Sequence, residues 1–297
     1  MQRIPLWVHP ALILAGLLYG GNYRMAKEVL DNYIEPFGLN LIRVLAAVLV
    51  FWMLGFIKPE RIDKADYGRF ALCAIFGTSV NILLFFKGLS YTTPVNSSLI
   101  LTTLPIAVLV VSYILTGEKI RLFQLIGIAL GLSGAFLLLN TDQINFANKS
   151  LLGDIMVLLN TISYAVYLVL VKPLMKKYHA FTVLKWLFTL GFIIVAPLGL
   201  EQFLAIDLRA FDSFGLVALI YVAFATTVFA YFLNIKGLQY VSSTIVGYYI
   251  YLQPLFAGFI DIAIGKQSMS TQLIMSSLLI FAGVFLVSNP KMQSRLS

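Results

Sequence analysis

Apolar residues fill ten stretches of the chain, each about 20 residues long, and short segments rich in charged residues separate them. A helix of this length crosses a hydrocarbon core of about 30 Å. The strict polar and apolar alternation of a membrane β-barrel is absent. The pattern predicts an all-α membrane protein with ten transmembrane helices, at residues 10–30, 36–56, 67–88, 94–115, 121–140, 151–174, 180–200, 213–236, 242–264 and 271–289.

A motif in the first half of the chain returns in the second half. The residues 87–89, Lys-Gly-Leu, recur as residues 236–238, which is 149 positions later. Two prolines inside long apolar stretches, Pro105 and Pro254, are also 149 positions apart. Such spacing indicates an internal repeat in which one helix of each half is interrupted at the same place.

The repeat extends over all five helices of each half, because Tyr19 and Tyr164 in the first helix of each half are related by 145 positions. We therefore assign residues 1–144 to a first repeat and residues 145–297 to a second. Since five is odd, the second repeat enters the membrane upside down relative to the first. Matching broken helices in inverted repeats point to a binding site between them, so Pro105 and Pro254 are predicted to be helix breaks and hinges.

The composition indicates a protein that lies in lipid. Hydrophobic residues make up 60% of the chain, charged residues 11%, and the mean hydropathy is +0.91. The net charge of +8 is spread over helix ends, so membrane topology explains it better than nucleic-acid binding does. With the N-terminus inside, fourteen basic residues fall on the inner side and five on the outer side. This asymmetry predicts that both termini are cytoplasmic.

Polar and aromatic residues form stripes on six of the predicted helices. Asn160, Tyr164 and Tyr167 follow the i, i+4, i+7 spacing of one helix face. The stripes have two interpretations: hydrogen bonds that hold helices together, or the lining of a substrate cavity between the repeats. We favour the cavity for the group as a whole, and its other candidate residues are Tyr19, Asn22, Arg43, Thr78, Asn81, Phe85, Thr102, Thr227, Tyr231, Asn234, Tyr248 and Tyr251.

Few charged residues stand inside the apolar stretches, and such residues suggest function because their burial is costly. Arg43 lies deep enough to line the cavity. Asp261 is the acid furthest inside an apolar stretch, and it either forms a structural ion pair or carries a coupling proton. Lys87 and Lys236 end two equivalent helices on opposite sides of the membrane. They either attract an anionic substrate or mark the membrane interface.

The sequence has no pattern of a known catalytic site. It lacks a P-loop, a Gly-x-Ser-x-Gly motif and a His-Glu-x-x-His motif, and its two histidines lie near predicted membrane edges. The lone Cys73 has no partner for a disulfide or a thiolate metal site. We therefore expect neither an enzyme nor a cofactor or metal site, and transport energy would come from a gradient.

Small residues mark the last helix of each half. Gly127, Gly131 and Gly134 form a small-xxx-small face in the first half, and Ser276, Ser277 and Gly283 lie among apolar residues in the second. Such faces allow close packing of helix backbones. The packing partner is either another helix of the same chain or a second copy, so the chain is expected to be a monomer or a weak homo-oligomer.

Together these features make the chain similar to the EamA-like family of the drug/metabolite transporter superfamily. The resemblance covers nearly the whole chain and rests on the order of its motifs, which are Tyr19 to Asn22, Pro36 with Arg43, Lys87 to Leu89, Pro105, Gly117-Glu118, Gly153-Asp154 and Ser163 to Tyr167. The resemblance implies a bacterial inner-membrane carrier, often an exporter of amino acids or related metabolites, with a central cavity. The second half departs from the family pattern at Gly265-Lys266, where a Gly-Glu pair is usual.

The leading functional prediction is a secondary transporter that binds a small solute between its repeats and works by alternating access. A rival prediction in the same class is an organic-anion exchanger that uses Lys87, Lys236 and Arg43. A rival from another class is a membrane enzyme or a non-transporting assembly subunit. The expected partners are the lipid bilayer and a small-molecule substrate.

Overall fold

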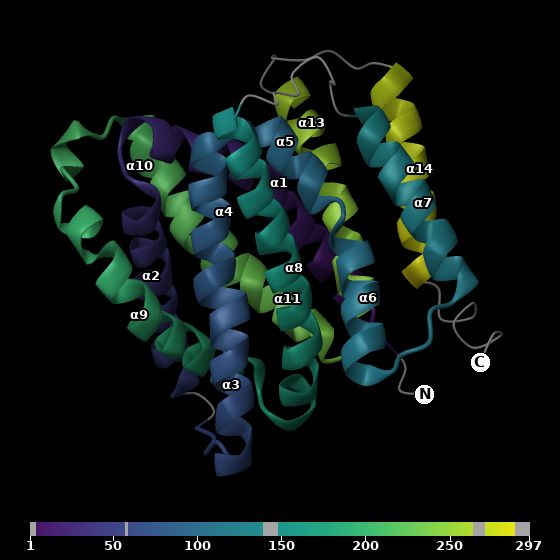
Figure 1. Cartoon of the computed structure of the whole chain (residues 1–297), viewed down its shortest axis with the longest axis horizontal. Helices are drawn as coiled ribbons and strands as arrows, with labels where there is room; N and C mark the ends of the chain where they lie inside the picture. The colour runs from purple at the N-terminus through teal and green to yellow at the C-terminus, as the bar shows by residue number, and fades with distance from the viewer. Residues whose placement is uncertain (1–3, 57–58, 139–147, 264–270, 289–297) are drawn as a thin grey trace.

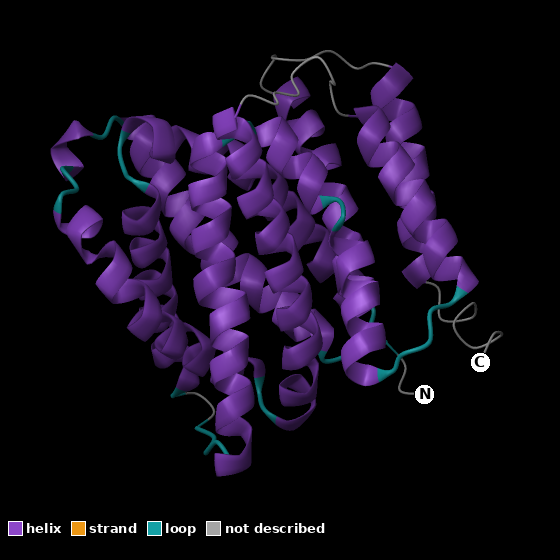
Figure 2. Ribbon diagram, viewed as in Figure 1, coloured by secondary structure: helices purple, strands orange, loops and turns teal. Residues whose placement is uncertain are grey.

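A computed structural model describes residues 4–56, 59–138, 148–263 and 271–288. These residues form helices joined by short loops, with no strand among them (Figure 2). The helices stand side by side in one bundle, with α7 and α14 together at one edge and α2 and α9 near the opposite edge (Figure 1).

The first half of the chain begins with two uninterrupted helices and continues with helices that change type or break. In order, its elements are α1 (Val8–Asn32), α2 (Pro36–Gly55), η1 (Lys64–Asp66), α3 (Tyr67–Ala74), the π-helix η2 (Ile75–Ser79), α4 (Val80–Tyr91), α5 (Pro94–Leu101), α6 (Leu104–Thr116) and α7 (Leu122–Leu138).

The second half also begins with two long helices and continues with helices that change type or break. Its elements are α8 (Asn148–Lys177), α9 (Ala180–Leu204), η4 (Leu208–Ala210), α10 (Ser213–Ile220), the π-helix η5 (Tyr221–Ala230), α11 (Tyr231–Leu238), α12 (Ser243–Tyr248), η6 (Tyr249–Tyr251), α13 (Leu252–Ala263) and α14 (Thr271–Ser288).

The apolar stretches predict the positions of the helices well, since each stretch is helical over most of its described residues. By length and hydropathy, six helical segments of the described chain are long and apolar enough to cross a membrane, and two shorter apolar helices accompany them. The six long segments are Pro36–Gly55, Lys64–Tyr91, Asn96–Thr116, Ser150–Lys177, Ala180–Leu204 and Ser213–Leu238. The chain is therefore a helical membrane protein.

The described helices are interrupted close to both repeated prolines, and the role of these prolines as hinges stays a prediction. In the first half, α5 ends at Leu101 and α6 starts at Leu104, one residue before Pro105. In the second half, the 3-10 turn η6 at Tyr249–Tyr251 separates α12 from α13, which contains Pro254 near its start. Proline cannot donate a backbone hydrogen bond, so it is tolerated in the first turn of a new helix and disfavoured further in.

The two π-helices are features that the apolar pattern does not predict. In η2 the backbone oxygen of Gly77 accepts a hydrogen bond from the Tyr231 hydroxyl at 2.8 Å, and that of Phe76 accepts one from Ser163 at 2.8 Å. In η5 the backbone oxygen of Val222 accepts one from Nε of Arg43 at 3.3 Å. Each π-helix thus offers carbonyl groups to side chains of the other half of the chain.

The glycines of α7 pack against α14 within the same chain. A Cβ atom on Gly127 would lie 2.3 Å from a methyl group of Val287, and one on Gly134 would lie 2.9 Å from the backbone oxygen of Ser276. The two helix backbones therefore approach too closely for larger side chains at these positions. Intramolecular packing accounts for this small-residue face.

A capping contact fixes the loop before α10. The carboxylate of Asp212 accepts hydrogen bonds from the backbone N–H of Gly215 at 2.6 Å and from the hydroxyl of Tyr33 at 3.0 Å. These two donors favour the ionised form and hold the pKa of Asp212 below its ordinary value. The contact ties the end of α1 to the start of α10.

Candidate functional site

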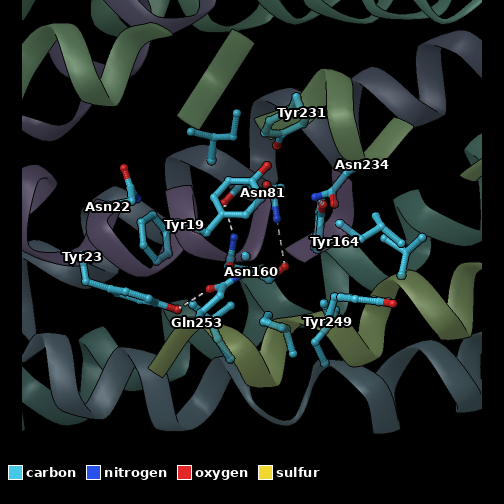
Figure 3. Close-up of a pocket in the computed structure, with 18 of the residues that line it drawn as sticks. Tyr19, Asn22, Tyr23, Asn81, Asn160, Tyr164, Tyr231, Asn234, Tyr249 and Gln253 are labelled. Carbon is cyan, nitrogen blue, oxygen red and sulfur yellow. Dashed lines mark hydrogen bonds between the residues drawn. The ribbon is translucent and has the colours of Figure 1, made fainter. Parts of the chain in front are cut away.

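A cavity of about 110 Å³ is lined by side chains from both halves of the chain (Figure 3). A single buried water needs only about 10–15 Å³ on this measure, so the cavity has room for a larger solute. Its wall combines apolar, aromatic and amide side chains from both halves, namely Leu12, Gly16, Tyr19, Asn22, Tyr23, Arg43, Asn81, Ile82, Phe85, Leu101, Leu104, Asn160, Tyr164, Tyr231, Asn234, Val246, Tyr249, Ile250 and Gln253.

Nine of the side chains predicted from the polar stripes line this cavity. They come from α1, α2, α4, α8 and α11, and they are Tyr19, Asn22, Arg43, Asn81, Phe85, Asn160, Tyr164, Tyr231 and Asn234. Within one helix, the spacing places such residues on a common face, since residues three or four apart share a face. Their role in binding substrate stays a prediction.

Two asparagines join the halves across the cavity wall. The side-chain nitrogen of Asn81 on α4 donates to the backbone oxygen of Asn160 at 3.1 Å. The side-chain nitrogen of Asn160 on α8 donates in return to the backbone oxygen of Asn81 at 2.8 Å (Figure 3). Both residues are buried. This reciprocal pair fixes the position of α4 against α8 at the depth of the cavity.

Tyrosine hydroxyls and rings form another part of the wall. Asn234 donates from its side chain to the Tyr164 hydroxyl at 3.4 Å, and the Tyr164 ring stacks on Tyr167 with 5.6 Å between ring centroids. The Tyr231 hydroxyl points toward η2 and donates to Gly77. Aromatic faces and hydroxyls together suit an amphipathic solute better than a bare ion.

Arg43 is the one residue of the described wall that carries a full charge, and the described wall contains no carboxylate. Its side chain is 4% exposed. The guanidinium lies over the Phe86 ring, with 4.4 Å from its carbon to the ring centroid, while its Nε donates to Val222. Within the described residues, no acid lies within ion-pair distance of Arg43.

Three polar lining residues were not among the predicted site residues. The Tyr23 hydroxyl donates to the side-chain oxygen of Gln253 at 3.0 Å, and Tyr249 shares a short hydrogen bond of 2.5 Å with Nδ1 of His9. Gln253 shares the polar side of its predicted helix with Tyr248 and Tyr251 and precedes the repeated proline Pro254.

Six predicted site residues lie outside the cavity lining. Their polar atoms mostly bond to nearby backbone: Thr78 donates to Ala74 and Leu187, and Tyr248 donates to Gln124. The full set is Thr78, Thr102, Tyr167, Thr227, Tyr248 and Tyr251, all of them buried. Thr78 and Tyr248 fit the alternative interpretation, in which polar side chains hold helices together, because each bonds to the backbone of another helix.

The remaining charged candidates are not in the described lining either. Lys87 lies on α4, four residues before its end, with its nitrogen 4.8 Å from the centroid of the Tyr91 ring, and Lys236 lies in the last turn of α11. Asp261 belongs to α13, but its side chain lies outside the described residues, so proton coupling through Asp261 stays a prediction. Within the described residues there is no group of three His, Cys, Asp or Glu side chains that could hold a metal ion.

The sequence model of the EamA-like transporter family matches residues 6–140 and again residues 151–289. The chain belongs to the EamA-like transporter family. Among curated EamA-like relatives, an uncharacterized transporter of Archaeoglobus fulgidus is 28% identical, with 94% of this chain and 96% of the relative aligned. The uncharacterized transporter YyaM of Bacillus subtilis is 24% identical, with 97% and 95% aligned.

The fold of this family member also matches a solved crystal structure. The TM-score is 0.69, and the match covers 92% of this chain and 96% of the other at 17% identity. At this identity the likeness concerns the fold alone. The relatives and the double family match together support a membrane transporter.

Proposed function

We propose that this EamA-like chain is a secondary transporter, which carries a small organic solute across the membrane by alternating access. The single observation that supports it most is the cavity, whose apolar, aromatic and amide lining comes from both halves of the chain. In transporters with repeated halves, substrate binds near the midplane between the repeats. The proposed direction, export of an amino acid or related metabolite, rests on the family resemblance.

The proposal includes ten membrane crossings arranged as two inverted five-helix repeats, at residues 1–144 and 145–297. The helix contacts are consistent with a pseudo-two-fold axis. The second helix of one half, α2, packs on its counterpart α9, and the last helix, α7, packs on its counterpart α14. The first helix of each half packs on the third helix of the other, since α8 packs on α4 and α1 packs on η5 and α11.

Two lysines at equivalent positions of the halves, Lys27 and Lys172, make equivalent hydrogen bonds, which supports the same symmetry. The Lys27 side chain on α1 donates to the backbone oxygen of Leu89, near the end of α4. In the second half the Lys172 side chain on α8 donates to the backbone oxygens of Leu238 and Val241, at the end of α11. Residues 27 and 172 are 145 apart, and residues 89 and 238 are 149 apart, which are the two spacings of the repeat. Cations at helix C-termini also interact favourably with the helix dipole.

The transport role of the cavity can be tested through Tyr164, which lines the wall and stacks on Tyr167. Tyr164→Ala removes a large aromatic contact, so we expect the transport rate to fall about tenfold or more. The measurement is uptake of a radiolabelled metabolite panel into liposomes that contain the pure protein. Tyr113→Ala is the matched control, because Tyr113 is 57% exposed on α6 and lies outside the cavity lining.

The melting temperature in detergent separates a transport role from a structural role. A binding residue should lose transport while the protein melts close to the wild-type temperature. Equal losses of transport and stability in Tyr164→Ala, or equal transport by Tyr164→Ala and Tyr113→Ala, would contradict the proposal.

We also propose that the protein lies in the cytoplasmic membrane with both termini inside, because of the charge asymmetry of its loops. Reporter fusions should place the segments around Lys64 and Lys119 inside and the segment around Arg209 outside. A fusion at Lys64 that reports from the outer side would reverse the orientation and rule out this topology.

A further inference from the structure

The wall of the cavity contains a buried cation, and none of the described residues places an anion opposite it. Arg43 is 4% exposed, and the other lining side chains are apolar, amide or phenolic. Burial of an unpaired charge is costly, so buried charges are normally paired. Within the described residues Arg43 contacts the Val222 oxygen and the Phe86 ring. Neither of these neutralises its charge.

The guanidinium is oriented by contacts of its Nε atom and its face, which do not use its two Nη groups. Nε donates to the Val222 oxygen, which also accepts hydrogen bonds from the hydroxyls of Thr226 at 2.8 Å and Thr227 at 2.9 Å. The face of the guanidinium lies over Phe86. The two Nη groups therefore keep their donors, and their fork geometry matches the two oxygens of a carboxylate.

From this geometry we propose that the cavity recognises a small organic monocarboxylate, whose carboxylate pairs with the two Nη groups of Arg43. One cation balances one negative charge, whereas a phosphate dianion would need further positive groups that the described wall does not contain. The aromatic rings of Tyr19, Phe85 and Tyr231 suit the apolar body of such a molecule. The proposal rests on the proposed transport function, because it takes this cavity as the substrate site.

This assignment differs from recognition by the lysines at the helix ends. Lys87 lies near the rings of Phe37 and Tyr91 at the end of α4, and it is not part of the cavity lining. A carboxylate at Arg43 would instead lie in the bundle interior, where low polarity strengthens a charge-assisted pair. Arg43 and Lys87 therefore form a natural pair of variants for a test.

The test measures binding to the purified full-length protein in detergent, by calorimetry and by thermal shift. The probes are acetate, butyrate, phenylacetate and indole-3-acetate, each beside its primary amide, which has nearly the same shape without the charge. We expect at least one carboxylate to bind and its amide to bind much more weakly. In Arg43→Gln, affinity for that carboxylate should fall about 30-fold or more, the usual loss for one partner of a buried charge pair.

Two further variants, Lys87→Gln and Arg43→Lys, show whether a loss of binding is specific to the Arg43 guanidinium. Lys87→Gln should bind the carboxylate as the wild type does. Arg43→Lys, which keeps the charge but loses the fork, should bind it with intermediate affinity and serves if Arg43→Gln does not fold. The inference is overturned if no carboxylate binds better than its amide, if both Arg43 variants bind the carboxylate like the wild type, or if only Lys87→Gln loses binding.

Failure of this inference and failure of the transport proposal give different results. If neutral or cationic solutes cross proteoliposomes as fast with Arg43→Gln as with the wild type, transport stands and the carboxylate inference falls. If carboxylates bind through Arg43 but no solute crosses the membrane, the inference stands and the transport proposal falls.

Discussion

Replacing Gly283 by valine is expected to separate α14 from α7 and to leave little folded protein. A Cβ atom at position 283 would lie 2.8 Å from the backbone oxygen of Gly127 and 3.0 Å from the backbone nitrogen of Gly131. Both are backbone atoms of a helix, so neither can rotate away as the end of a side chain could. Overpacking of this kind costs about 1–3 kcal/mol or more, a large part of the total stability of about 5–15 kcal/mol typical of folded proteins.

The measurement is size-exclusion chromatography and thermal melting of the variant in detergent. Ala282→Val is the matched control, because Ala282 is the adjacent residue on α14 and its side chain is exposed. We expect Ala282→Val to elute and melt like the wild type and Gly283→Val to aggregate or melt at a much lower temperature. Wild-type behaviour of Gly283→Val would show that the two helices are not held together in this way.

Replacing Asn160 by aspartate is expected to lower both stability and transport strongly. The side-chain nitrogen of Asn160 donates to the backbone oxygen of Asn81, and in the variant a carboxylate oxygen would face that carbonyl oxygen instead. Position 160 is 4% exposed, so a carboxylate there would be a buried charge that has lost its donor to the Asn81 oxygen. The combined loss is expected to be about 3 kcal/mol or more, because an attractive contact is replaced by a repulsive one.

Thr161→Val provides the comparison for this variant. The Thr161 hydroxyl is also buried, but it donates to the backbone oxygen of Val157 within its own helix at 2.9 Å. Its removal therefore breaks no contact between the halves, and we expect a change below about 1 kcal/mol. Thermal melting and proteoliposome transport measure both variants. Equal stability of Asn160→Asp and Thr161→Val would mean that the asparagine pair does not join the halves.

The sequence predicts the helices and their two breaks because both are local properties. An apolar stretch of membrane length forms a helix wherever its neighbours lie, and a proline disfavours helix continuity at its own position. The same local rule, helical spacing, identifies Asn160 and Tyr164 as residues of one wall. Helical spacing does not predict which of the side chains on such a face reach the cavity.

Two tyrosines show where that local rule stops. Tyr167 shares the stripe of Tyr164, yet its ring lies where Gly77 has no side chain, and a Cβ atom on that glycine would be 2.3 Å from the ring. Tyr251 likewise packs on Gly131, where a Cβ atom would be 2.5 Å away. Each ring is buried against a glycine far away in the sequence. The spacing of residues within one helix does not identify such a distant packing partner. The helix faces of both tyrosines therefore predict the cavity, although neither residue belongs to its described lining.

The π-helices were missed for a related reason. A π-helix has hydrogen bonds between residues five apart, whereas an α-helix has them between residues four apart. The apolar composition of the sequence does not distinguish the two. The Thr-Thr pair at positions 226 and 227 offers two hydroxyls to the Val222 oxygen, but a threonine pair in an ordinary α-helix would look no different in the sequence.

The π-helix η5 has a consequence for how this chain should be aligned with its relatives. A π-turn arises when one residue is inserted into an α-helix, and removal of that residue restores the α-helix without rotating the segments on either side. A relative that is one residue shorter between positions 221 and 230 would therefore keep the faces of α10 and α11, but we expect it to lose the π-helical carbonyl of Val222, to which Arg43 donates. A gap of one residue in this helix thus separates relatives that can orient an arginine in this way from relatives that cannot.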